Sequence, residues 1–169
     1  MDLKTYIRDV PDFPKQGIVF RDISPMLANP KAWQAAVDQL CRNIETYEPD
    51  ALAGIDARGF LVAAPVACQL GIGFSMIRKK GKLPWNTVDY TYELEYGSDV
   101  VEMHGDAFTE GQKVVVCDDL LATGGTAQAA CELVRKVNAD PVSLACLIEL
   151  EALKGRDKLG IPVTALMAY

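Results

Sequence analysis

The sequence is short of the residues that many metal and redox sites require. Its 169 residues include a single histidine, His104, and five dispersed cysteines with no CxxC pair. A zinc site needs several closely spaced histidine or cysteine ligands, and disulfide frameworks are typical of small secreted chains with paired cysteines. We therefore expect core thiols and a structural or surface histidine, so that any catalysis depends on carboxylates and cations.

Long apolar runs and an excess of basic residues are also missing. No stretch approaches 18 apolar residues, and Met1–Lys4 opens no signal peptide, so we expect a soluble, cytoplasmic protein without a membrane partner. Seventeen basic residues against 23 acidic ones give a net charge of −6, which argues against a nucleic-acid partner. A length of 169 residues with 50% hydrophobic content predicts a single domain over residues 1–169.

One stretch, KVVVCDDLLATGGT from Lys113 to Thr126, combines three chemically different parts. Its apolar run, Val114–Cys117, has no polar alternation and predicts a strand buried on both faces of a parallel sheet. Asp118 and Asp119 would end that strand at its carboxyl end, where open α/β sheets bind ligands. Small and hydroxylated residues then precede a helical pattern, whose N-terminus attracts anions: Ala122, Thr123, Gly124, Gly125 and Thr126.

This order of parts suggests a sugar phosphate as the ligand. A phosphate at the helix N-terminus leaves the carboxylates for hydroxyl groups, since carboxylates accept hydrogen bonds from hydroxyls but repel further phosphate. The loop has neither the GxxxxGK[ST] pattern of nucleoside triphosphate sites nor the GxGxxG pattern of dinucleotide sites. The alternative interpretation is structural: a strand, an acidic turn and a capped helix.

A second strand-loop-helix unit precedes this one. Ala51–Ile55 predicts a strand, and Phe60–Leu70 predicts a helix that ends at Gly71. The loop between them, Asp56-Ala57-Arg58-Gly59, would hold a second anionic group or simply cap the helix. A basic cluster at residues 78–82 would either be a solvated turn or add charge for such a ligand.

The remaining patterns alternate between helix and strand. We predict a weak N-terminal helix, a helix capped by Asn29 with Pro30 at its first position, further strands, a hairpin and a helix behind the glycine pair: residues 1–10, 30–44, 72–77, 90–96 with 100–104 across Gly97-Ser98-Asp99, 126–137, 141–149 and 163–169. Strands alternating with helices at this spacing indicate an α/β fold with a right-handed, doubly wound, mostly parallel sheet. The polar segment after residue 77 is long enough to be a lid.

VVVCDDLLATGGT resembles the phosphoribosyl-diphosphate (PRPP) binding motif of the type I phosphoribosyltransferases. Five more segments resemble the adenine phosphoribosyltransferase family, in that family's order: FPKQGIVFRDISP (13–25), ARGF (57–60), RKKGKLP (78–84), LEYG (94–97) and LKGRDKL (153–159). The resemblance spans nearly the whole chain. It implies a twisted, mostly parallel sheet flanked by helices, an N-terminal cover with the adenine subsite over about 1–28, a lid and hood hairpin over about 79–105, and a homodimer.

The resemblance also implies a role for individual residues. The loop for the phosphate of PRPP or AMP would comprise Asp118, Asp119, Ala122, Thr123, Gly124, Gly125 and Thr126. Pyrophosphate would lie on Asp56, Ala57, Arg58, Lys79 and Lys82, with a cis peptide bond at Asp56–Ala57, and adenine on Val19, Phe20, Arg21 and Leu150. Glu95 would be the catalytic residue that handles the purine proton, and Tyr96 would belong to the lid.

The reaction implied is phosphoribosyl transfer from PRPP to adenine, which gives AMP and pyrophosphate in purine salvage. Mg2+ would be held by PRPP and water rather than directly by the protein. Two alternatives keep the same loop: a transferase for another purine such as hypoxanthine, and a PRPP-sensing regulatory protein. GIVFRDISP and LEYG favour adenine, and the acidic balance disfavours the regulator, which would usually carry a basic patch for DNA or RNA.

Overall fold

The computed structural model describes residues 1–93 and 97–169. Within it the chain divides into two compact units, Met1–Gln39 and Leu40–Tyr169, which we describe separately. The division falls within helix α2 (Pro30–Ile44). The single domain expected over residues 1–169 stays a prediction.

The first unit contains a short hairpin followed by helices. It comprises η1 (Leu3–Tyr6), β1 (Arg8–Pro11), β2 (Val19–Asp22), α1 (Ser24–Ala28) and the first part of α2. β1 and β2 pair antiparallel, with Val10 opposite Phe20. The helix predicted over residues 1–10 is therefore wrong beyond Tyr6, because the partner strand β2 gives residues 8–11 a ladder that outweighs a weak local helical pattern.

The predicted start of α2 is confirmed. The Asn29 side-chain oxygen accepts hydrogen bonds from the backbone N–H groups of Lys31 and Ala32, both at 3.1 Å. These bonds satisfy two of the donors that a helix N-terminus otherwise leaves without a partner. Pro30 occupies the first helical position, where its missing N–H costs nothing.

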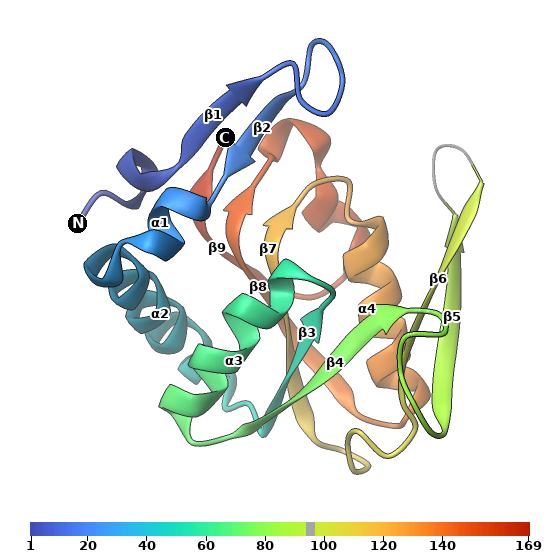
Figure 1. Ribbon diagram of the computed structural model, residues 1–169. Coiled ribbons are helices and arrows are strands. Elements are labelled where there is room, and N and C mark those ends of the chain that lie inside the picture. Colours follow the sequence, from blue (N-terminus) through green and yellow to red (C-terminus); the bar gives the residue numbers. More distant parts are fainter. Residues whose placement is uncertain (94–96) are drawn as a thin grey trace. The chain divides into compact units, whose positions relative to one another are not determined.

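The second unit is built on a mixed, mostly parallel sheet (Figure 1). Its described strands follow the order β5-β6-β4-β3-β7-β8-β9, with bounds β3 (Ala51–Ile55), β4 (Gly73–Lys79), β5 (Thr87–Glu93), β6 (Ser98–His104), β7 (Lys113–Leu121), β8 (Asp140–Glu149) and β9 (Val163–Ala168). β4, β3, β7, β8 and β9 are parallel, and the β5–β6 hairpin adds antiparallel strands beside β4. The α/β fold class predicted from the sequence is confirmed.

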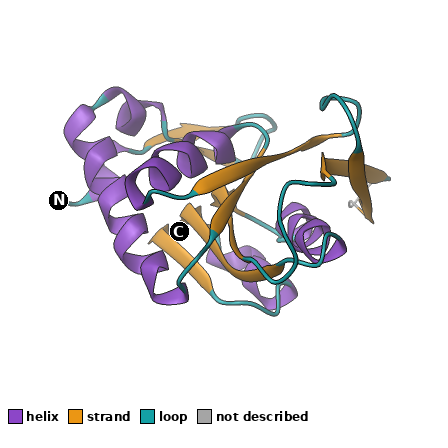
Figure 2. Cartoon of the chain, turned by 90° about the horizontal axis from the view of Figure 1, so that it is seen from below, coloured by secondary structure: helices purple, strands orange, loops and turns teal. Residues whose placement is uncertain are grey.

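Helices α3 (Arg58–Leu70) and α4 (Gly125–Lys136) cover opposite faces of this sheet (Figure 2). Gly54 of β3 faces α3, because a Cβ built on it would lie 3.0 Å from the Cβ of Ala63. The neighbouring Ala53 belongs to the same core cluster as Ala130 of α4. Since successive strand residues point to opposite faces, β3 is buried on both sides. Short 3-10 turns complete the unit: η2 (Glu45–Tyr47), η3 (Glu151–Leu153) and η4 (Gly155–Lys158).

Two predicted boundaries need correction. Asp118 and Asp119 do not end their strand, because β8 continues to pair with β7 as far as Leu121. The second strand of the hairpin also begins earlier than expected, at Ser98 instead of Val100, because Ser98 and Asp99 already pair with Glu93 and Tyr92. In both cases a neighbouring strand extends the ladder beyond the point where the local sequence turns polar.

The strand order produces a topological switch point between β3 and β7. From β3 the chain proceeds to β4 on one side, whereas β7, β8 and β9 extend on the other. β3 pairs with β7 only as far as Cys117, and the chain then leaves the sheet through Asp56 and Ala57. In open α/β sheets, ligands bind in the crevice outside the strand ends at such a point. Among the described residues, no helix is long and apolar enough to cross a membrane.

Candidate active site

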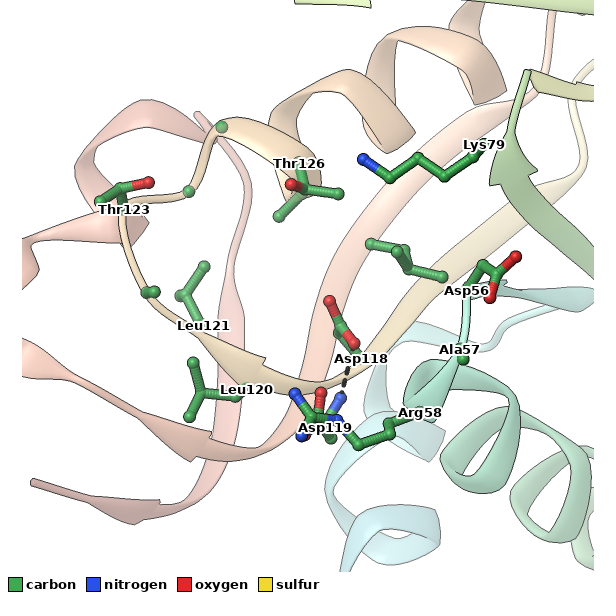
Figure 3. A pocket seen from close by; sticks show the side chains of 15 residues that line it. Asp56, Ala57, Arg58, Lys79, Asp118, Asp119, Leu120, Leu121, Thr123 and Thr126 are labelled. Atoms are coloured by element: carbon green, nitrogen blue, oxygen red, sulfur yellow. Dashed lines mark hydrogen bonds and ion pairs between the residues drawn. The ribbon is translucent and has the colours of Figure 1, made fainter. Parts of the chain in front are cut away.

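A pocket lies at this switch point, outside the carboxyl ends of β3 and β7 (Figure 3). It brings together the end of β3 and the loop after it, the end of β4, and the segment from β7 into α4. Its lining is Ile55, Asp56, Ala57, Arg58, Lys79 and residues 118–127. Both loops that the sequence singled out therefore line one cavity, together with one lysine of the basic cluster.

The glycine-rich loop provides backbone donors at the start of α4. Gly124 caps this helix with φ +83°, a left-handed conformation that favours glycine. Because glycine carries no side chain, it cannot satisfy the N–H groups of the first turn in the way that a serine or aspartate cap would. Those donors and the positive end of the helix dipole suit an anion.

Asp118, Asp119 and Arg58 form the floor of the pocket (Figure 3). Asp119 is 5% exposed, and its Oδ2 lies 2.8 Å from Nε of Arg58. Oδ1 of Asp118 accepts a hydrogen bond from the backbone N–H of Asp119 at 2.8 Å. Burial, followed by the charge of Asp119, raises the pKa of the Asp118 carboxyl well above its ordinary value, although Arg58 opposes the shift.

This raised pKa predicts that Asp118 costs the ligand-free protein stability. The folded state holds the Asp118 proton more tightly than the unfolded chain does, so stability falls as pH rises from the ordinary carboxyl pKa through the raised one. Asp118→Asn should therefore unfold at a higher temperature at pH 7.5, by about 2–4 °C for each kcal/mol of penalty removed. Calorimetric scans between pH 5 and 8 test this. A variant midpoint equal to or below wild type, with parallel pH profiles, would contradict it.

A second set of contacts holds Lys79 over the loop. Its ammonium group pairs with Asp99 of β6 and donates to the hydroxyl of Tyr92 of β5 at 3.3 Å. The Tyr92 hydroxyl in turn lies 3.2 Å from Oγ1 of Thr126, toward which Lys79 points in Figure 3. The hood hairpin, β4 and the glycine loop are thus connected through side chains. The sequence did not single out Tyr92 or Asp99, since alternation in a strand does not indicate which polar groups meet those of another element.

The Asp56 loop is held by an ion pair of its own. The Asp56 carboxylate lies 2.8 Å from Nε of Arg78, and the Asp56–Ala57 peptide bond is cis, as the resemblance implies. Gly59 packs so closely on β7 that a Cβ there would lie 2.5 Å from the Cys117 carbonyl oxygen. The start of α3 is therefore fixed against the strand that carries the two aspartates.

The structure places the other predicted site residues outside this pocket lining. Lys82 follows β4, and its backbone N–H donates to Oε1 of Glu102 at 2.9 Å. Burial acts against the Glu102 charge, but backbone donors from residues 81–83 lower its pKa below the ordinary value. Leu150 follows β8 and donates its N–H to the Leu121 carbonyl at 2.9 Å. The roles of Lys82 and Leu150 stay predictions.

Val19, Phe20 and Arg21 form most of β2 in the first unit. The Phe20 ring packs edge-on against Phe13, with centroids 5.3 Å apart and an interplanar angle of 81°. The Arg21 guanidinium pairs with Asp9. Glu95 and Tyr96 lie outside the described residues, so their predicted roles also stay predictions.

Comparison with known proteins relates this geometry to one family. The family model described as a phosphoribosyl transferase domain matches residues 25–161. The adenine phosphoribosyltransferase of Gluconobacter oxydans is 56% identical over 169 residues, covering 100% of this chain and 94% of that protein. The enzyme of the same name from Rhodospirillum centenum is 55% identical, covering 100% and 99%.

Solved structures of the same family have the same fold as this chain. The crystal structure of adenine phosphoribosyltransferase from Thermoanaerobacter pseudethanolicus superposes with a TM-score of 0.96 at 47% identity, covering 99% of this chain and 98% of that one. The Saccharomyces cerevisiae enzyme, complexed with an imino-altritol bisphosphate and adenine, superposes with a TM-score of 0.94 at 40% identity, covering 98% and 96%.

Proposed function

The chain belongs to the adenine phosphoribosyltransferase family, and on this premise we propose that it transfers the 5-phosphoribosyl group from PRPP to adenine, releasing AMP and pyrophosphate. This reaction serves purine salvage. The observation that carries the proposal is the pocket at the β3–β7 switch point, where a loop suited to phosphate, two aspartates and a cationic loop face one cavity. PRPP offers these groups a 5′-phosphate, ribose hydroxyls and a pyrophosphate.

Each part of PRPP has a chemically matched partner. The backbone of the phosphate loop, residues 122–126, would take the 5′-phosphate. Asp118 and Asp119 would accept hydrogen bonds from the ribose hydroxyls. The pyrophosphate would lie between the loop at residues 56–58 and Lys79, with Lys82 added from the lid.

The chain's contribution to the reaction is positioning and charge stabilisation. A purine nitrogen attacks the anomeric carbon while pyrophosphate leaves, through an oxocarbenium-like transition state such as glycosyl transfer uses. Negative charge grows on the leaving group, so Arg58 and Lys79 stabilise the transition state more than the ground state. Glu95 would manage the purine proton, as the family resemblance implies.

The residues present fit a substrate-borne Mg2+ ion. Asp118 and Asp119 offer hard carboxylate oxygens at the pocket floor, and Mg2+ commonly keeps several waters when it binds through substrate phosphates. These two residues would hold its waters, and the ion would neutralise charge on the pyrophosphate of PRPP. The described residues contain no group of three or more histidine, cysteine or acidic side chains that could hold a metal.

Adenine recognition is assigned to Val19, Phe20, Arg21 and Leu150 on the strength of the family resemblance. The homodimer and the cytoplasmic location have the same basis. Light scattering coupled to size-exclusion chromatography at micromolar concentration tests the dimer, for which the expected mass is twice 18.4 kDa.

The proposed activity is tested by incubating the protein with adenine, PRPP and Mg2+ and quantifying AMP and pyrophosphate. Equal amounts of the two products are expected, and hypoxanthine in place of adenine should give almost no IMP. Faster use of hypoxanthine would favour the alternative purine transferase. PRPP binding without any turnover would favour a regulatory protein.

The hydroxyl of Tyr92 should contribute to PRPP affinity. Tyr92→Phe removes only the hydroxyl oxygen, which contacts Lys79, Thr126 and Asp99, and the expected net loss is about 1 kcal/mol. We expect PRPP to bind about fivefold more weakly by calorimetry. Tyr90→Phe, the same change on the same strand, serves as the control and should leave affinity unchanged. Wild-type affinity in Tyr92→Phe would contradict this.

A further inference from the structure

We propose that the segment Leu150–Lys158, here called the brace, fixes the shape of the phosphate loop through backbone contact, with Gly155 as the positioning residue. The brace includes most of LKGRDKL, for which neither the sequence nor the pocket supplied a role. The inference rests on the proposed function, since it concerns how the 5′-phosphate is held.

The contact involves a glycine on each side. A Cβ built on Gly155 would lie 2.2 Å from the carbonyl oxygen of Ala122 and 3.1 Å from the backbone nitrogen of Gly124. A Cβ built on Gly124 would lie 2.4 Å from the Gly155 carbonyl oxygen. All the atoms met are backbone atoms, so no flexible side chain could move aside. Only glycine at both positions permits this approach.

The brace is anchored at the carboxyl ends of β7 and β8, and the phosphate loop begins at the same end of β7. Leu150 donates its N–H to the carbonyl of Leu121, the last residue of β7, at 2.9 Å. Farther along, Arg156 reaches back to the end of β8, where its Nε lies 2.7 Å from Oε1 of Glu149 and its terminal nitrogen pairs with Oε2. Glu149 is 3% exposed, and its hydrogen bond with Arg156 lowers the pKa of its carboxyl. This two-point geometry is the most directional form of ion pair.

These contacts give the brace a functional consequence. A short loop without side-chain support can sample several backbone shapes, and each would aim its N–H groups differently. Here Ala122 and Gly124 meet Gly155 while Leu121 is bonded to Leu150, so the loop is held before and within its turn. Holding donors in place before the ligand arrives raises affinity, because the ordering cost is already met.

The first test is Gly155→Ala. The added methyl must push Ala122 by about an ångström, and displacements of that size can cost about 100-fold. We expect the dissociation constants of ribose 5-phosphate and AMP to rise at least about tenfold, whereas inorganic pyrophosphate, which needs no phosphate loop, keeps its affinity. Gly73→Ala is the matched control, since a Cβ at Gly73 meets nothing within 4 Å.

A second variant removes the anchor without touching the glycine contact. Arg156→Met should weaken the binding of ribose 5-phosphate severalfold. Arg135→Met, which breaks the exposed Arg135–Glu132 pair, should leave this binding unchanged. If folded Gly155→Ala binds ribose 5-phosphate as wild type does, the proposed role of the brace is wrong. If Gly155→Ala does not fold, unchanged binding in Arg156→Met is the result that overturns it. If wild type binds neither ribose 5-phosphate nor AMP, the proposed function fails and the role of the brace with it. If wild type binds both and the variants bind them equally well, the role of the brace alone fails.

Discussion

Replacing Glu95 with glutamine should lower the turnover number by about 100-fold or more while PRPP affinity stays unchanged. The substitution keeps the size of the side chain and removes its capacity to accept a proton. Glu95 lies in LEYG, the segment that resembles the family's catalytic glutamate. If it acts in the chemical step, the loss appears in turnover and not in binding.

Rapid-quench measurement of AMP formation in a single turnover, together with calorimetry for PRPP, separates the two effects. Glu93→Gln provides a control two residues away, since Glu93 is an exposed glutamate at the end of β5. A Glu95→Gln enzyme with wild-type single-turnover rate would exclude Glu95 from the chemistry. A loss confined to PRPP affinity would reassign it to binding.

Adenine should be preferred to hypoxanthine by about 10⁴ or more in kcat/KM. Adenine presents an N1 acceptor beside an N6 donor, and hypoxanthine presents an N1–H donor beside an O6 acceptor. A site built for one pattern leaves buried groups unpaired or opposed when it meets the other. The resemblance assigns this recognition to the backbone N–H of Arg21 and the C=O of Val19.

The ladder in the first unit is compatible with that assignment. Pro11 lies opposite Val19 and has no N–H, so this pair cannot exchange both hydrogen bonds. Bonded and non-bonded pairs alternate along an antiparallel ladder, which favours Val10–Phe20 as the bonded pair. The backbone groups of Val19 and Arg21 then point away from β1.

Two variants separate stacking from hydrogen bonding. Phe20→Ala should weaken the binding of adenine and of hypoxanthine to the same extent, because stacking does not depend on the hydrogen-bond pattern of the base. Arg21→Lys should leave the preference largely intact, since the side chain does not read the base. Competition kinetics with both bases measures the ratio for wild type and each variant. Comparable use of the two bases by wild type would overturn the adenine assignment.

The sequence predicted the architecture well where the signal was local and apolar. Val114–Cys117 forms a fully buried strand, as predicted, and it lies inside the sheet between β3 and β8. The bounds of β3 agree residue for residue with the prediction. Residues 8–11 were misread because the partner that makes them a strand lies elsewhere in the chain.

The candidate site likewise contains residues that local sequence identified and residues that it did not. The loops at residues 56–58 and 118–126 have recognisable local chemistry, and both line the pocket. Tyr92, Asp99 and Gly155 contribute through contacts with distant segments, which composition and spacing do not encode. Gly155 shows this most clearly. A side chain there is excluded by the backbone of Ala122 and Gly124, about thirty residues earlier, and not by the conformation of its own turn.

A crystal structure of the protein with AMP would test the proposed binding mode. We expect the 5′-phosphate within hydrogen-bond distance of the backbone N–H groups of residues 122–126, with the ribose hydroxyls on Asp118 and Asp119. We further expect adenine stacked on Phe20, with N6 facing the Val19 carbonyl. A phosphate bound away from this loop, or a base that does not contact residues 19–21, would contradict the proposed function.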